Sequence, residues 1–186
     1  MRSERELVEA LRARETGAFE ELYGRYRGQI WRFLARLTGG GSAAEDLFQE
    51  TWLAAARHAH LLREDTAPER WLYTIAHNKH RNAQRSWVTE RRRGAEIRAQ
   101  RPLGPSRPDD AAAAQREVER VREAMARLPE AHREVLILCA CEGLDSNGAA
   151  AVLGIAPEAA RKRLSRARAE LADLVGRKTA EKGDPR

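Results

Sequence analysis

Apolar residues recur every three or four positions along most of the chain, a spacing that predicts helices and no convincing strand. An early helix carries Leu7 and Leu11 and breaks near Thr16-Gly17. A longer helix follows and ends at the glycines 39–41, with one apolar face made of Phe19, Leu22, Tyr26, Ile30, Phe33 and Leu37. The predicted fold class is therefore all-α.

Capping patterns predict where two further helices begin. Ser42 with Glu45, and Thr66 with Glu69, have the spacing of capping boxes, in which the two side chains bond the opening backbone amides of a helix. The first of these helices runs to about His60. The second has a proline in its first turn, where the missing N–H costs nothing.

The composition changes after Trp87. Residues 91–110 contain three of the seven prolines, two glycines and many charges, with no periodic apolar face, so they are predicted to form a flexible linker. The chain is then two helical domains joined by a linker, with predicted ranges of 1–92, 93–111 and 112–176.

The second domain has the spacing of a helix-turn-helix. One helix is expected to be capped by Asp109-Asp110 and to carry the periodic apolar residues Val118, Val121, Met125 and Leu128. Helices are predicted next at Pro129–Glu142, Ser146–Leu153 and Pro157 to about Val175, and the turn at 153–155 separates the last two.

The last of these helices is basic. Lys and Arg outnumber Asp and Glu by 34 to 28 in the whole chain, a net charge of +6. Within this helix an apolar stripe of Ala160, Leu164, Ala167 and Leu171 is predicted to face inward. The cations suit contact with DNA, although a solvated basic face gives the same pattern: Arg161, Lys162, Arg163, Arg166 and Arg168.

The helix after the glycines has two contrasting faces. Its predicted buried stripe is Phe48, Trp52, Ala55, Ala56 and Ala59. An acidic face with an exposed leucine suits a protein partner better than a nucleic acid, and the alternative is again a solvated face. Its members are Asp46, Gln49, Glu50, Leu53 and Arg57.

Several segments together resemble a known family. AEDLFQETWLAAARHAH, APERWLYTIAHNKHRN, RLPEAHREVLILCACEGL and LGIAPEAARKRLSRARAEL occur in the order found in bacterial extracytoplasmic-function sigma factors, the small two-domain class of RNA polymerase specificity subunit. The resemblance implies that Asp46, Gln49 and Glu50, with Leu53 beside them, dock on the clamp helices of the polymerase large subunit. It also implies that the helix-turn-helix reads the -35 promoter element.

For the segment WLYTIAHN and the loop before it, the resemblance implies capture of the melted non-template strand of the -10 element. Extruding a base costs a few kcal/mol, so the protein must offer contacts that only an unstacked base makes. Asn78 aligns with the family's base-contacting asparagine, and Asn82 lies one turn further on. Trp71, Tyr73 and Ile75 are typical of the core of such a helix, and Trp71 is also a candidate DNA contact. The candidate phosphate contacts are Arg70, Lys79, Arg81 and Arg85.

The expected partners are core RNA polymerase, promoter DNA and an anti-sigma factor, with no small-molecule substrate. No cofactor, metal site or catalytic centre is predicted: His58, His60, His77 and His80 lack an acid or cysteine that completes a ligand set. Cys139 and Cys141 are interpreted as reduced core thiols. The charged N-terminus and the lack of a long apolar run predict a cytosolic protein without membrane insertion.

One alternative function stays open. A regulator could bind DNA through the same helix-turn-helix without serving as a polymerase subunit, using its first domain for another protein. The acidic face distinguishes the two, because a sigma factor needs a surface for polymerase and an autonomous regulator does not.

Overall fold

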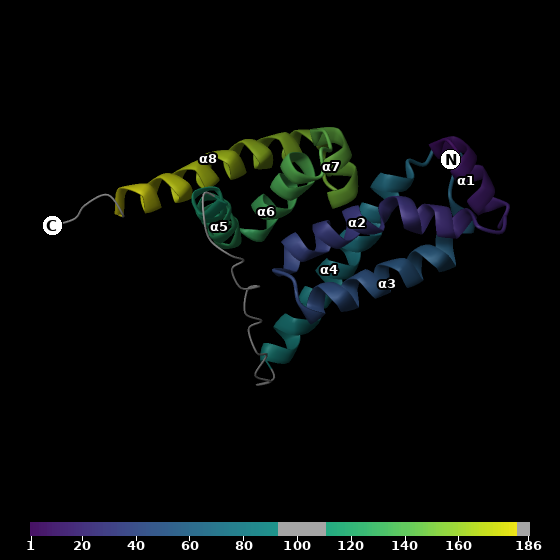
Figure 1. Cartoon of the computed structure of the whole chain (residues 1–186), viewed down its shortest axis with the longest axis horizontal. Coiled ribbons are helices and arrows are strands. Elements are labelled where there is room, and N and C mark those ends of the chain that lie inside the picture. The colour runs from purple at the N-terminus through teal and green to yellow at the C-terminus, as the bar shows by residue number, and fades with distance from the viewer. Residues whose placement is uncertain (93–110, 182–186) are drawn as a thin grey trace. The chain divides into compact units, whose positions relative to one another are not determined.

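Helices joined by short loops make up residues 1–92 and 111–181, the parts of the chain that the computed structural model describes (Figure 1). No strand occurs within those ranges, so the all-α prediction is confirmed. The predicted linker lies outside them, except for its last residue. The elements are α1 (Glu4–Arg12), α2 (Ala18–Thr38), α3 (Ser42–His58), a 3-10 turn (Ala59–Leu61), α4 (Pro68–Arg92), α5 (Ala111–Arg127), α6 (Glu130–Leu136), a π turn (Ile137–Cys141), α7 (Ser146–Leu153) and α8 (Pro157–Glu181).

The chain forms two compact units. The first contains α1 to α4, and the second contains α5, α6, α8 and most of α7. Each has its own packing between helices.

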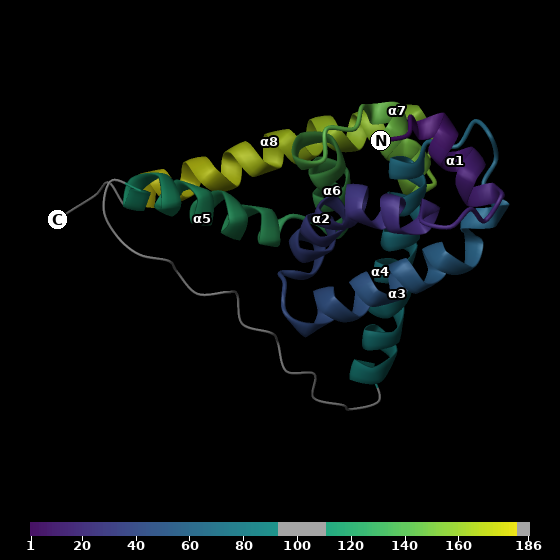
Figure 2. The same cartoon turned by 45° about the vertical axis from the view of Figure 1, so that its right-hand side comes forward.

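The core of the first unit lies where α2, α3 and α4 pack together (Figure 2). The rings of Phe33 on α2 and Tyr73 on α4 meet edge to face with their centroids 5.1 Å apart. Burying a side chain of this size is worth about 1.5–3 kcal/mol, so the contact fixes which face of α4 remains exposed. The apolar face predicted for α2 is buried at Leu22, Tyr26, Ile30, Phe33 and Leu37.

The helix α3 begins at Ser42, as predicted, but not through a capping box. Its N-cap is Gly41, which has φ 74 and makes no side-chain cap bond. A glycine adopts this positive φ without the steric cost that a side chain brings. Gly41 is therefore the cap, and Ser42 is the first residue of the helix. The predicted pairing of Ser42 with Glu45 is wrong.

In the second predicted capping box, Thr66 does not occupy the cap position of its helix. Because α4 begins at Pro68, Thr66 lies before the cap position. Its hydroxyl accepts a hydrogen bond from the backbone N–H of Arg63 at 3.1 Å, which closes the preceding loop instead.

A capping box occurs where none was predicted, at the start of α1. The Ser3 hydroxyl accepts from the Glu6 N–H at 3.3 Å, and the Glu6 carboxylate accepts from the Ser3 N–H at 2.7 Å. The hydrogen bond from the Ser3 backbone N–H is the main cause that lowers the pKa of Glu6.

In the second unit, the segment predicted as one helix at Pro129–Glu142 divides into α6 and a π turn. The π turn takes more residues per turn than an α-helix and so changes which side chains face inward. Cys141 is exposed and Cys139 half-buried, so the prediction of two core thiols is wrong. Val118, one of the periodic apolar residues of α5, is 61% exposed.

The helix-turn-helix spacing is confirmed by α7, the turn and α8. Asp145 caps α7 by accepting from the Gly148 N–H at 2.7 Å. The turn passes through Gly154, which has φ 65 and so takes a conformation that favours glycine. On α8, Ala160 and Ala167 are buried as predicted, which leaves its basic side exposed.

Candidate functional site

The acidic face of α3 is exposed along its length. Asp46, Gln49, Glu50 and Leu53 all lie outside the core, and Leu53 is 57% exposed. This follows from burial of the opposite face, where Leu47, Thr51, Trp52 and Ala55 lie against the rest of the unit. An exposed leucine among acids and an amide has the composition of a protein-binding surface.

An apolar groove of about 350 Å³ adjoins this face. Trp31 on α2 and Phe48 on α3 line it, with ring centroids 5.6 Å apart, and Trp31 is 37% exposed. Gln49 also lines the groove. Trp31 is not among the predicted site residues, although a tryptophan outside the apolar face of α2 is a signal in the sequence.

The exposed face of α4 carries amides and cations. Asn78 and Asn82 are both exposed, which is the placement that a base-reading amide requires. Arg70, Arg81 and Arg85 are exposed as well. Trp71 is half-buried, so only part of its ring is available.

One ion pair joins the two predicted sites. Lys79 Nζ on α4 lies 3.1 Å from Glu50 Oε2 on α3. Glu50 was predicted to face a protein partner and Lys79 to face DNA, and the structure brings the two side chains together. The pair occupies one ammonium donor of Lys79 and the Oε2 atom of Glu50, so an external ligand competes with this contact.

The loop between the 3-10 turn and α4 is held by local contacts. Arg12 Nη1 on α1 lies 2.7 Å from Glu64 Oε1, and this hydrogen bond is the main cause that lowers the pKa of Glu64. Arg63 Nε lies 3.2 Å from Asp65 Oδ1. Helix α1 therefore lies next to the loop that precedes α4.

On α8 the cations surround a patch of small side chains. At about 100° per residue, Ser165 and Ala169 fall between Arg161 and Arg166, and all four are exposed. Lys162 pairs with Glu158 at 2.7 Å, whereas Arg161 and Arg166 have no ion-pair partner within residues 1–92 and 111–181. Small residues between cations let a helix approach a groove closely. The other two predicted contacts are Arg163, which is half-buried, and Arg168, which is exposed.

The chain matches two protein-family models, Sigma-70 region 2 over residues 22–91 and Sigma-70, region 4 over residues 118–171. This pair of regions, in this order, defines a sigma factor of the sigma-70 type. No helix in the described parts of the chain is long and apolar enough to cross a membrane.

Relatives narrow the class. The RNA polymerase sigma factor CarQ of Myxococcus xanthus is 33% identical over 171 residues, covering 91% of this chain and 95% of CarQ. The ECF RNA polymerase sigma factor SigM of Mycobacterium tuberculosis is 34% identical over 177 residues, covering 94% of this chain and 86% of SigM. The solved structure of CnrH in complex with the cytosolic domain of CnrY has a TM-score of 0.69 at 29% identity, covering 93% of this chain and 97% of CnrH. The chain belongs to the extracytoplasmic-function RNA polymerase sigma factors.

This membership decides between the two functions left open by the sequence. The alternative of a regulator that does not serve as a polymerase subunit is not favoured, because region 2 is matched as well as the helix-turn-helix region. The protein is an RNA polymerase sigma factor.

Proposed function

We propose that the α3 face formed by Asp46, Gln49, Glu50 and Leu53 binds core RNA polymerase, and that the exposed face of α4 captures the melted -10 element. The observation that carries the proposal is the exposure of Asn78 on α4 among cations. An amide offers both a donor and an acceptor to the edge of an unstacked base, while Arg70 and Arg81 can hold neighbouring phosphates.

The helix α8 is proposed to read the -35 element in duplex DNA. Arg161 and Arg166 flank a narrow small-residue patch and can reach phosphates or guanine edges in a major groove. The two sets of DNA contacts then lie in different units: residues 1–92 read melted DNA and residues 112–176 read the duplex, joined through 93–111.

Further partners follow from the family. The relative CnrH is solved with the cytosolic domain of CnrY, and an anti-sigma factor is proposed as a protein partner of this chain. The same likeness supports a cytoplasmic location, with association to the nucleoid in the holoenzyme. Sigma factors are in general not enzymes, and the proposal needs no catalytic residue, metal or cofactor in this chain.

Run-off transcription with purified core polymerase tests this function. Asp46→Arg should abolish assembly with core and hence transcription, because like charges placed across such an interface cost several kcal/mol. The matched control is Glu9→Arg, which reverses an exposed acid on α1. If the folded Asp46→Arg protein co-purifies with core at the yield of the Glu9→Arg protein, the α3 face is not the polymerase site.

A further inference from the structure

The loop that precedes α4 contains a tight turn at residues 63–66. The Thr66 N–H donates to the Arg63 carbonyl at 3.0 Å, and the Arg63 N–H donates to the Thr66 hydroxyl at 3.1 Å. These two bonds close the turn and leave Glu64 and Asp65 exposed at its tip. Because both bonds lie inside the turn, they fix its shape and not its orientation on the first unit.

The two acids at the tip have different kinds of partner. Asp65 pairs inside the turn, where its Oδ1 lies 3.2 Å from Arg63 Nε. Glu64 pairs outside it, because its Oε1 lies 2.7 Å from Nη1 of Arg12, a residue 52 positions earlier in the chain. The contact with Arg12 therefore joins the tip of the turn to α1.

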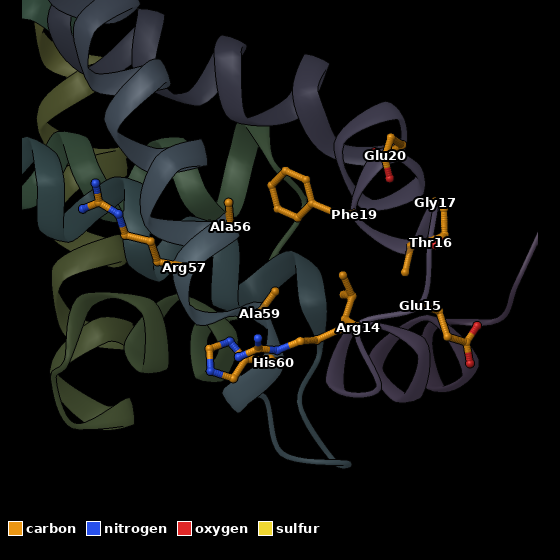
Figure 3. Close-up of a pocket in the computed structure, with 12 residues that line it drawn as sticks. Arg14, Glu15, Thr16, Gly17, Phe19, Glu20, Ala56, Arg57, Ala59 and His60 are labelled. Carbon is orange, nitrogen blue, oxygen red and sulfur yellow. The ribbon is translucent and has the colours of Figure 1, made fainter.

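Helix α1 is a fixed support for this contact. Leu7 and Leu11 on its inner face are buried, and a capping box closes its first turn. Arg12 is its last residue, so the position of Arg12 follows from that of the buried helix. The segment after α1 lies against the 3-10 turn that leads into the loop, and Figure 3 shows the Arg14 side chain directed toward His60 of that turn. The match to Sigma-70 region 2 begins at residue 22 and does not extend to α1.

The pair also determines the charge that the turn presents. A carboxylate without a partner beside a strand of DNA repels its phosphates. Arg12 faces Glu64 and Arg63 faces Asp65, so each acid at the tip has a cation next to it. Since the hydrogen bond from Arg12 lowers the pKa of Glu64, the carboxylate is ionised and the pair is charged throughout the neutral pH range.

We propose that Arg12 is a positioning residue for recognition of the -10 element: through Glu64 it orients the turn at residues 63–66 toward the base that this loop and α4 capture. This inference rests on the proposed function of α4. A loop that already has its binding conformation loses less conformational freedom when DNA binds, so the pair favours the base that fits that conformation. Exposed ion pairs are weak, so the effect on base preference is about 1.4-fold to 5-fold.

The test measures base preference in holoenzyme. Core polymerase with each variant selects from a pool of single-stranded non-template DNA randomised across the -10 positions, and sequencing of the bound fraction gives the preference at every position. Arg12→Gln and Glu64→Gln should each reduce the preference at the same position by about 1.4-fold to 5-fold. Glu64→Gln leaves no acid facing the DNA, so its loss of preference reports orientation and not repulsion. Arg12→Lys keeps the charge and should retain part of the preference.

The matched control is Arg5→Gln. Arg5 also lowers the pKa of Glu64 through its charge, but it pairs with Glu9 on its own helix at 3.1 Å. Its removal takes a cation away from Glu64 without breaking a bond to the turn, and it should leave the preference and the melting temperature as they are in Arg12→Gln or nearer to the unsubstituted protein. The double variant Arg12→Glu with Glu64→Arg exchanges the charges of the pair, and it should recover the preference that either reversal alone loses.

Unaltered preference in both Arg12→Gln and Glu64→Gln would overturn the proposal. A loss in Arg12→Gln alone would also overturn it, because Arg12 would then contact DNA directly, and so would a double variant no better than the single reversals. Asn78→Ala, selected in parallel, reports on the proposed function of α4 separately. If it shifts the preference at one base while the Arg12 and Glu64 variants do not, the role of Arg12 is wrong and that of α4 stands; if it has no effect, the function proposed for α4 fails.

Discussion

Replacing Glu50 with glutamine should strengthen the binding of single-stranded -10 DNA by the free protein, because it removes the partner of Lys79. The two side chains are 3.1 Å apart, with exposed fractions of 55% for Glu50 and 34% for Lys79. Solvent screens such a pair, so it is worth about 0.2–1 kcal/mol. Opening it before a phosphate binds Lys79 costs that amount, which corresponds to about 1.4-fold to 5-fold in Kd.

Fluorescence anisotropy with a labelled non-template oligonucleotide measures this gain. Glu9→Gln is the matched control, because it changes the net charge equally and breaks the exposed pair with Arg5 on α1. In a Lys79→Gln background the Glu50 substitution should have no effect, since the cation it releases is absent. Equal affinities for Glu50→Gln and Glu9→Gln would show that the pair does not restrain Lys79, and the reasoning would be wrong.

Four other substitutions test the remaining elements. Asn78→Ala should leave stability unchanged and remove roughly 1–3 kcal/mol of discrimination at one -10 position, measured by transcription from promoters that carry each base in turn. Arg161→Ala should weaken binding to a -35 duplex in anisotropy, and an unaltered affinity would identify its charge as solvated. Phe33→Ala should cost about 3–5 kcal/mol in chemical denaturation, because the ring is fully buried. Glu6 has a lowered pKa in the folded protein, so its stabilising contribution is present above the usual value of 4.5 and is lost as the pH falls through the lower folded value. Glu6→Gln should therefore flatten the dependence of the unfolding midpoint on pH in that acid range, and an unchanged dependence would contradict the role of the capping box.

The exposed faces of α3 and α4 could be predicted from the sequence because helix geometry alone determines which residues share a face. The positions of Asp46, Gln49 and Leu53 at i, i+3 and i+7 require no tertiary information, nor does the exposure of Asn78 once its helix is placed. Membership of the family followed from the order of several such segments.

The contacts between helices could not be predicted in this way. Phe19, Ala56 and His60 line one groove, at the start of α2 and the end of α3. Phe19 lies about forty positions from the other two, and only the packing of α2 against α3 brings them together. The start of α3 at Ser42 was predicted correctly, but its cap was assigned to Ser42 because the capping pattern is local, whereas Gly41 takes the cap through a backbone conformation that the pattern does not encode. The π turn that exposes Cys141 likewise has no signature in the spacing of apolar residues.

The pairing of Glu50 with Lys79 has a consequence for how the two proposed ligands interact. Both helices are fixed to one core, through Trp52 on α3 and Tyr73 on α4, so binding at one face does not need to move the other. If polymerase engages Glu50, it releases Lys79 for the non-template strand, and the cost of opening the pair is met once for both ligands. Thermodynamic linkage then requires that DNA strengthen polymerase binding by the same factor of about 1.4 to 5. In holoenzyme saturated with core, Glu50→Gln should therefore give no gain in DNA affinity, whereas a gain equal to that of the free protein would show that polymerase leaves the ion pair closed.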